Sequence, residues 1–294
     1  VRLQENYGVN GNSTNAQFGG ATNKNNWSTS DYTTRVRGYI TADAREQTEY
    51  GTLRSYIAVG VSTNDVGANT ASNTFSANRA FIQFAGFTAG IAQSFYDFYS
   101  VPASSFWGAF PASDTGDPGW MVMAYTAQFG NGLSASISAE ERRDPAGGIV
   151  SGMTAFTAAT AATGIANINS QGGFQSPDVV GNLRLDQAWG SAQVMAAAHE
   201  VNSTYYTAAG ATANGPSDKW GYAVGAGLKL NAPMFGPGDY FQAQVNYTEG
   251  ALRYVFMTPN SNWFKATGAT FGFGVLSDSV SNAGVAGSSK ALTT

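Results

Sequence analysis

Hydrophobic and polar residues alternate through residues 33–46, which read "TTRVRGYITADARE". One set of alternate residues is small and mostly apolar, whereas the other set carries three arginines and an aspartate. A period of two predicts a β-strand with two unlike faces. The apolar set lacks the large side chains that fill a soluble core. The strand is therefore predicted to turn a smooth face outward and a charged face inward.

The same alternation recurs about eleven times, in segments of roughly nine to fifteen residues. The predicted strands are 1–8, 32–46, 51–63, 74–84, 87–96, 120–129, 133–142, 178–188, 192–201, 219–230 and 239–248. Strands in soluble proteins average about five or six residues, whereas a tilted strand needs about nine to eleven to cross a membrane. These lengths favour membrane-spanning strands.

The links between these strands alternate in length. The short links are 47–50, 85–86, 130–132, 189–191 and 231–238, and the long polar links are 8–31, 64–73, 97–119, 143–177 and 202–218. This parity is typical of an up-and-down barrel with short turns on one rim and long loops on the other. Aromatic residues beside the short links predict an interfacial girdle: Tyr50, Phe84, Phe87, Phe129, Trp189, Phe235 and Tyr240.

Composition supports the same fold class. Charged residues make up only 12% of the 294 residues, yet no apolar run approaches the roughly 18 residues of a membrane helix. The chain has no cysteine, which excludes disulfides and thiolate metal sites, and its net charge of −4 argues against a nucleic-acid partner. The prediction is an all-β chain, a transmembrane antiparallel up-and-down β-barrel with a water-filled interior.

One long link differs from the others in its aromatic content. Residues 94–120 read "SFYDFYSVPASSFWGAFPASDTGDPGW" and include Phe106 and Trp107 together with the acids Asp97, Asp114 and Asp117. A loop so rich in aromatic residues must pack on a surface. We expect residues 97–119 to fold into the lumen as a constriction loop.

A basic wall is predicted opposite this loop. It consists of five of the fifteen Lys and Arg residues, gathered on three neighbouring strands: Arg35, Arg37, Arg45, Arg54 and Arg79. A basic wall facing an acidic loop would create a transverse field that selects permeants by charge and size. The alternative interpretation is that these arginines are solvated or form local salt bridges.

Three segments carry a family resemblance. "TTRVRGYITADAREQTEYGTLRSYIAVG", "NRAFIQFAGFTAGIAQSFYDFYS" and "DTGDPGWMVMAYTAQFGNGLSASISAE" resemble the general porins of α-proteobacteria, and the similarity extends over nearly all of residues 1–250. The resemblance implies one barrel domain over 1–294 with 16 strands and an inward-folded third external loop. It also implies a homotrimer in the Gram-negative outer membrane, in contact with lipid and lipopolysaccharide, that allows passive diffusion of ions and small hydrophilic solutes. Members of that family have an N-terminal segment with cysteines, further strands and a terminal aromatic residue, so the sequence is expected to be truncated at both ends.

Other functions were weighed against this one. The single histidine, His199, lies beside Glu200 without any catalytic motif, so no enzyme, catalytic residue or cofactor is expected. Asp114 and Asp117 could suit calcium in a β-rich adhesin or lectin, but a plain turn is the simpler interpretation and no metal site is expected. A substrate-specific channel, for example for sugars, stays open because the loop begins with four aromatic residues, Phe95, Tyr96, Phe98 and Tyr99.

Overall fold

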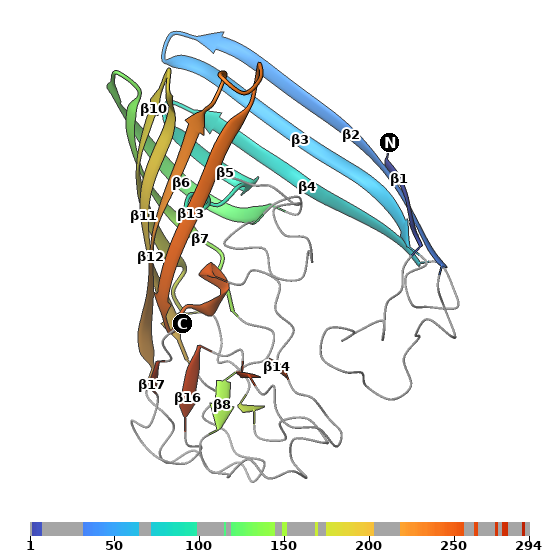
Figure 1. Ribbon diagram of the computed structural model, residues 1–294, viewed down its shortest axis with the longest axis vertical. Helices are drawn as coiled ribbons and strands as arrows, with labels where there is room; N and C mark the ends of the chain where they lie inside the picture. Colours follow the sequence, from blue (N-terminus) through green and yellow to red (C-terminus); the bar gives the residue numbers. More distant parts are fainter. Residues whose placement is uncertain are drawn as a thin grey trace.

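The computed structural model describes residues 2–7, 32–64, 72–98, 115, 119–144, 149–151, 168–169, 175–202, 218–255, 262–263, 274–275, 278–281 and 290–291. Eleven strands of one antiparallel sheet dominate it (Figure 1). They are β1 (Arg2–Tyr7), β2 (Tyr32–Thr48), β3 (Gly51–Asn64), β4 (Ser72–Phe84), β5 (Phe87–Ala92), β6 (Trp120–Gly130), β7 (Leu133–Glu140), β10 (Asp178–Gln187), β11 (Gly190–Val201), β12 (Lys219–Asn231) and β13 (Tyr240–Glu249). Each strand in this order pairs with the next, so the sheet is an up-and-down meander.

The eleven predicted strands are confirmed, with one clear difference in length. β5 ends at Ala92 rather than at residue 96, because the chain turns at Ser94, whose carbonyl accepts a hydrogen bond from the Asp97 amide at 3.2 Å. The main sheet contains eleven strands within the described residues, where the family resemblance implied sixteen for the complete barrel.

Short turns join the strands at one end of the sheet, and the long connections leave from the opposite end (Figure 1). In two of these turns both central residues have positive φ, at Ala85–Gly86 (48° and 86°) and Asn131–Gly132 (50° and 76°). Such turns match the right-handed twist of the strands they connect. The Asn-Gly pair is the strongest short sequence signal for a hairpin, and it fixes the β6–β7 register here.

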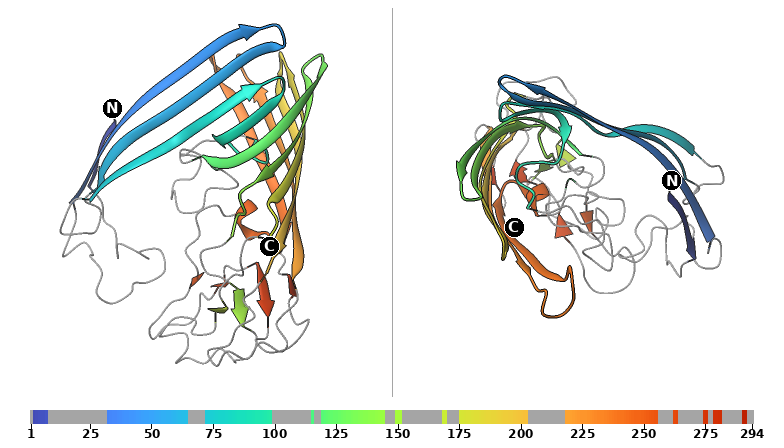
Figure 2. Two further views of the ribbon diagram at one scale, coloured as in Figure 1. Left: turned by 180° about the vertical axis from the view of Figure 1, so that it is seen from behind. Right: turned by 90° about the horizontal axis from the view of Figure 1, so that it is seen from above.

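The sheet curves into an open trough whose edges are β1 and β13, as the right-hand view in Figure 2 shows. Large apolar side chains with the predicted outward parity are exposed to the surroundings, including Ile40, Ile57, Ile137, Leu183, Val194 and Val224. The other parity carries polar residues such as Thr41, Arg54, Ser136, Asn182 and Gln244. The sheet therefore has the apolar exterior and polar interior expected of a membrane barrel.

A β-bulge in β4 changes which residues face inward. The pairing with β3 shifts between Ala58 and Val59, where Asn78 is the extra residue of β4. A bulge inserts one residue and reverses the side-chain alternation beyond it. Phe75 is consequently exposed outside, while Ser76 lies 3.5 Å from the Tyr39 hydroxyl and Arg79 also faces inward.

Smaller elements lie near the end of the main sheet that is opposite the short turns (Figure 1). A four-stranded sheet has the order β17 (Lys290–Ala291), β16 (Ser279–Ser281), β8 (Ile149–Ser151) and β9 (Ile168–Asn169), and β14 (Asn262–Trp263) pairs with β15 (Gly274–Val275). A single 3₁₀ turn, η2 (Leu252–Tyr254), follows β13. No helix among the described residues is long and apolar enough to span a membrane.

Candidate functional site

Residues 93–98 cross the polar face of the sheet directly after β5. The Asn182 side chain on β10 donates a hydrogen bond to the Phe95 carbonyl at 2.6 Å. Gln193 on β11 donates to the Tyr96 carbonyl, and the Tyr96 hydroxyl donates to Asn246 on β13, each at 3.5 Å. This segment therefore lies across β10, β11 and β13 on the inside of the curved sheet.

Two glycines of β12 make room for this segment. A Cβ atom at Gly227 would lie 2.3 Å from Cγ of Phe98, and one at Gly225 would lie 3.0 Å from the Tyr96 hydroxyl. Both distances are too short for a larger residue without a shift of the aromatic rings. The small inward-facing residues of β12 thus act as a seat for Tyr96 and Phe98, which are both buried.

A buried arginine holds the beginning of this segment. Arg143 is fully buried, and its guanidinium contacts Asp97 at 3.2 Å and Glu140 at 3.9 Å and donates a hydrogen bond to the Ser94 hydroxyl. The ring centre of Tyr254 lies 4.2 Å from the same guanidinium. Glu140 in turn accepts hydrogen bonds from the Ser94 hydroxyl at 2.5 Å and the Phe95 amide at 2.8 Å. These paired charges anchor the segment to the end of β7.

Thr115, from the far end of the loop, binds the same cluster of residues around Arg143. Its amide and hydroxyl donate to the Asp97 carboxylate at 2.6 and 2.5 Å, so the chain returns to the point where it left. The Gly119 amide then donates to the Thr115 carbonyl at 3.1 Å. Gly119 has φ of 69° and lies against β4, where an added Cβ would be 2.7 Å from the Arg79 guanidinium.

Burial also affects the phenols beside this anchor. It raises the pKa of Tyr96 above its usual range and raises the pKa of Tyr254 well above its usual value. Both phenols therefore stay neutral hydrogen-bond donors across physiological pH. The Tyr254 hydroxyl uses this role to donate to Asp178 at 2.8 Å.

His199 lies near the end of β11, between two aspartates. It is buried, and its Nδ1 lies 2.7 Å from the Asp178 carboxylate, while its Nε2 lies 3.4 Å from Asp278. Asp178 also accepts a hydrogen bond from the Arg143 amide at 3.2 Å. No group of three or more His, Cys, Asp or Glu side chains suited to a metal ion occurs among the described residues.

Two of the five predicted wall arginines form a local ion-pair cluster. Arg45 and Arg54 both bind the Asp43 carboxylate, at 2.8 and 2.9 Å. The Arg54 guanidinium also lies 5.3 Å from the ring centres of Tyr56 and Phe81, which stack on each other. Asp43 is thus part of the wall, and it offsets one of the two positive charges beside it.

The structure describes only some of the other predicted site residues. Arg79 lies on the inner side of β4, and its guanidinium donates to the Asn78 carbonyl at 2.7 Å. Arg35 and Arg37 belong to β2, opposite Asn64 and Ser62 of β3, but their side chains lie outside the described residues. Asp114, Asp117, Phe106 and Trp107 also lie outside them. Asp97 is buried with Arg143 and Thr115, which lie at the root of the loop.

The cluster of contacts around Arg143 was not predicted from the sequence, although the sequence contains an unusual run of charged residues there. Residues 140–144 are five consecutive charged residues in a chain with 12% charged residues, and they end a predicted strand. Such a run of charged residues usually lies on a solvent-exposed surface. The register that sets Glu140 opposite Asp178 turns it inward, where Ser94 and Asp97 meet it.

The family to which the sequence can be assigned agrees with this architecture. A family model described as a porin subfamily matches residues 1–290. The solved structure of the outer membrane channel DcaP of Acinetobacter baumannii is similar at 13% identity and a TM-score of 0.46, over 80% of this chain and 68% of that chain. No curated protein matches this sequence.

Proposed function

This chain belongs to the porin family and is a diffusion channel of the outer membrane, and we propose that residues 97–119 form the constriction that limits passage of ions and small hydrophilic solutes. The observation that carries this proposal is the path of residues 93–98 across the polar inner face of the sheet. A channel of this kind needs no cofactor, because the solutes move down their own gradients.

The two ends of the loop support an inward path. Phe98 lies on the seat formed by Gly227 of β12, and Thr115 returns to Asp97. Both ends are therefore fixed on the inner side of the trough. We infer that Phe106, Trp107, Asp114 and Asp117 extend from these ends into the lumen, while Asp97 anchors the loop.

The wall opposite would carry a moderate positive charge. Arg45 and Arg54 share Asp43, so this described cluster contributes about one net positive charge. We propose that Arg35, Arg37 and Arg79 add to it at the level of the loop. Solutes crossing between Asp114, Asp117 and this wall would be selected by size first and by charge second.

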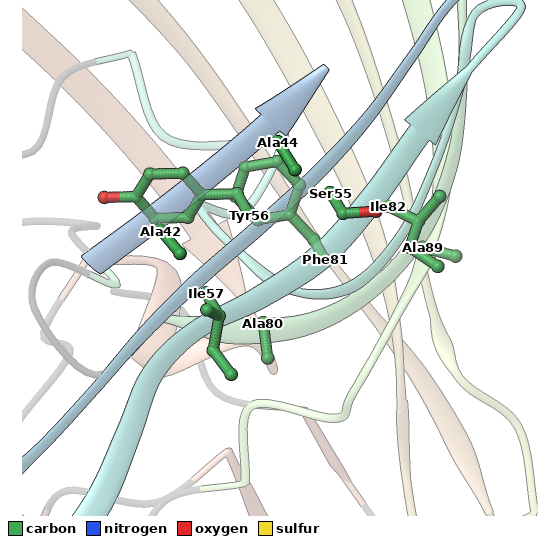
Figure 3. A pocket seen from close by; sticks show the side chains of 9 residues that line it. All are labelled: Ala42, Ala44, Ser55, Tyr56, Ile57, Ala80, Phe81, Ile82 and Ala89. Atoms are coloured by element: carbon green, nitrogen blue, oxygen red, sulfur yellow. The ribbon is translucent and has the colours of Figure 1, made fainter. Parts of the chain in front are cut away.

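The proposal extends to a homotrimer. The outer face of β2–β5 has a shallow depression of about 450 Å³, seen from close by in Figure 3. The side chains on this face are mostly small: Ala42, Ala44, Ser55, Ile57, Ala80, Ile82 and Ala89. A smooth face allows close approach of another subunit, as small residues do between membrane segments. We propose that lipid and lipopolysaccharide cover the remaining outer face, and that the chain stands with the porins of α-proteobacteria.

Planar-bilayer recordings test the channel and its constriction together. The unmodified chain should give discrete conductance steps, and the Asp114→Asn/Asp117→Asn variant should shift the reversal potential in a salt gradient toward anions. Arg54→Gln should shift it toward cations, because the removed charges have opposite signs. Asp239→Asn, at an exposed position beside a short turn, serves as the control for a lost carboxylate.

The outcomes separate the two claims. A folded protein that gives no conductance steps would contradict the channel function. Normal steps with a parental reversal potential in both test variants would show that residues 97–119 and this wall do not form the constriction.

A further inference from the structure

A polar pocket lies between the inward segment and the wall of the lumen. It has a volume of about 480 Å³, within the range of about 300–1,000 Å³ that is usual for small-molecule sites. Residues 93–98 form one side, and inward-facing residues of β6, β7, β10 and β11 form the other. The constriction proposal gives this pocket no role.

The pocket is lined mainly by neutral hydrogen-bonding groups. Thr126, Ser134 and Ser136 supply hydroxyls, and Gln128 and Asn182 supply amides. Within the described part of the chain, the Gln128 amide has no side-chain partner, and the Asn182 amide nitrogen is held by the Phe95 carbonyl at 2.6 Å, which leaves its oxygen as an acceptor. These groups can both donate and accept, as a solute with several hydroxyls requires.

Each charged group that lines the pocket has an oppositely charged partner. Arg184 binds the Asp186 carboxylate through two parallel hydrogen bonds, at 2.8 and 3.0 Å. The Asp97 carboxylate is held by Thr115 and Arg143 behind the pocket. A free anion would have to compete with Asp186 for Arg184, so the charge pattern favours a neutral solute.

Aromatic rings border the same space. Phe95 is half-buried and leaves part of its ring accessible, whereas Phe98 is buried with the Arg184 guanidinium 5.5 Å from its ring centre. A partly accessible aromatic residue beside polar groups suits a ligand with an apolar face and a hydroxyl-bearing edge, and the ring of a sugar has both.

We propose that this pocket is a weak binding subsite for neutral, polyhydroxylated solutes of sugar size, located beside the constriction. The inference rests on the proposed function, because the solute reaches the pocket through the lumen. Gln128, Asn182 and the Arg184–Asp186 pair supply the hydrogen bonds, and Phe95 supplies the apolar contact. Sugars should then reduce the ion current in a saturable way, whereas a plain pore would show only the effect of viscosity.

The test uses the full chain in planar bilayers, with glucose as the probe and gluconate as its charged counterpart. Glucose should lower the current with a saturating concentration dependence, and gluconate should do so more weakly. Gln128→Ala should weaken glucose binding by about three- to tenfold, the worth of one hydrogen bond. Gln242→Ala removes an amide from the inner wall outside the pocket and should leave binding unchanged.

A second variant should change which solute the pocket prefers, rather than weaken binding. Asp186→Asn should release Arg184 and increase the block by gluconate, since the guanidinium would lose the carboxylate that now competes for it. Stronger binding of gluconate than of glucose by the unmodified chain would overturn the proposal. Equal losses in Gln128→Ala and Gln242→Ala would also overturn it.

The outcomes distinguish a failure of the pocket proposal from a failure of the channel proposal. Normal conductance steps without glucose saturation would exclude the pocket and leave the channel function intact. If no steps appear, calorimetric titration of the folded protein in detergent with glucose and gluconate makes the same comparison without a current.

Discussion

Arg143 is a fully buried guanidinium that joins several separate parts of the chain. It contacts Asp97 and Ser94 of the inward segment, Glu140 at the end of β7 and the ring of Tyr254 in η2. Buried charges are tolerated only when they are paired and hydrogen-bonded. Removal of the cation would leave two buried carboxyl groups without their partner.

Arg143→Met should therefore lower the free energy of unfolding by about 3–5 kcal/mol. Arg45→Met is the matched control, because its side chain is 60% exposed and its pairing with Asp43 is screened by solvent. Urea unfolding in lipid vesicles gives both values. Equal, small losses in the two variants would mean that Arg143 does not hold the segment in place.

At the scale of the strands, the two faces of β7 should respond in opposite ways to the same charge. Ile137 is 60% exposed on the outer face, and its neighbour Ser136 faces the lumen, where its hydroxyl lies 2.8 Å from that of Thr126. Ile137→Lys should cost about 2–4 kcal/mol of folding free energy, because the ammonium would enter the apolar layer of the membrane. Ser136→Lys should fold normally and shift ion selectivity toward anions, because its ammonium would lie in the polar lumen. Folding yield in vesicles and the reversal potential test the pair, and a reversed order of folding losses would refute the assigned parity.

The seat on β12 gives a second test at this scale. Gly227→Ala should destabilise the protein by about 1–3 kcal/mol, because the new methyl group would overlap the Phe98 ring. In a Phe98→Ala background the same substitution should cost less than about 0.5 kcal/mol, which a double-mutant cycle measures. Gly38→Ala is the control, since no atom lies within 4 Å of its added Cβ. A cost at Gly227 that persists without the Phe98 ring would exclude this contact as its cause.

The strands could be predicted from the sequence because their signals are local. Alternation needs only neighbouring residues, and Asn131–Gly132 defines its own turn. The bulge at Asn78 and the pairing of Asp97 with Arg143 could not be predicted in this way. The bulge depends on how β4 pairs with β3, and the ion pair joins residues 46 positions apart. Such contacts depend on the register of several strands together, which residue alternation does not contain.

Across the whole molecule, aromatic residues form two exposed bands on the outer face. Tyr50, Phe87, Phe129, Trp189 and Phe241 lie beside the short turns, and Phe75, Trp220, Tyr222 and Tyr247 lie nearer the long connections. Tyr240, predicted for the first band, has the inward parity of Gln242 instead, and its ring contacts Lys229. Trp220 and Leu230 are about ten residues apart on β12. At about 3.3 Å per residue and a tilt of about 45°, this separation is about 23 Å along the membrane normal. It matches the apolar band of about 25 Å in outer-membrane barrels, so the strands fit the membrane that the family occupies.

The smooth outer face of β2–β5 leads to a prediction about assembly. Ala80 lies in the depression on this face, whereas Ala196 lies on the outer face of β11, opposite Val224 of β12. Tryptophan is apolar enough for either position, so both Ala80→Trp and Ala196→Trp should fold and conduct. Only Ala80→Trp should prevent close approach of subunits and reduce the native mass in mild detergent from three subunits to one. A trimer in both variants would place the interface elsewhere, and a single-subunit mass for the unmodified chain would exclude the trimer itself.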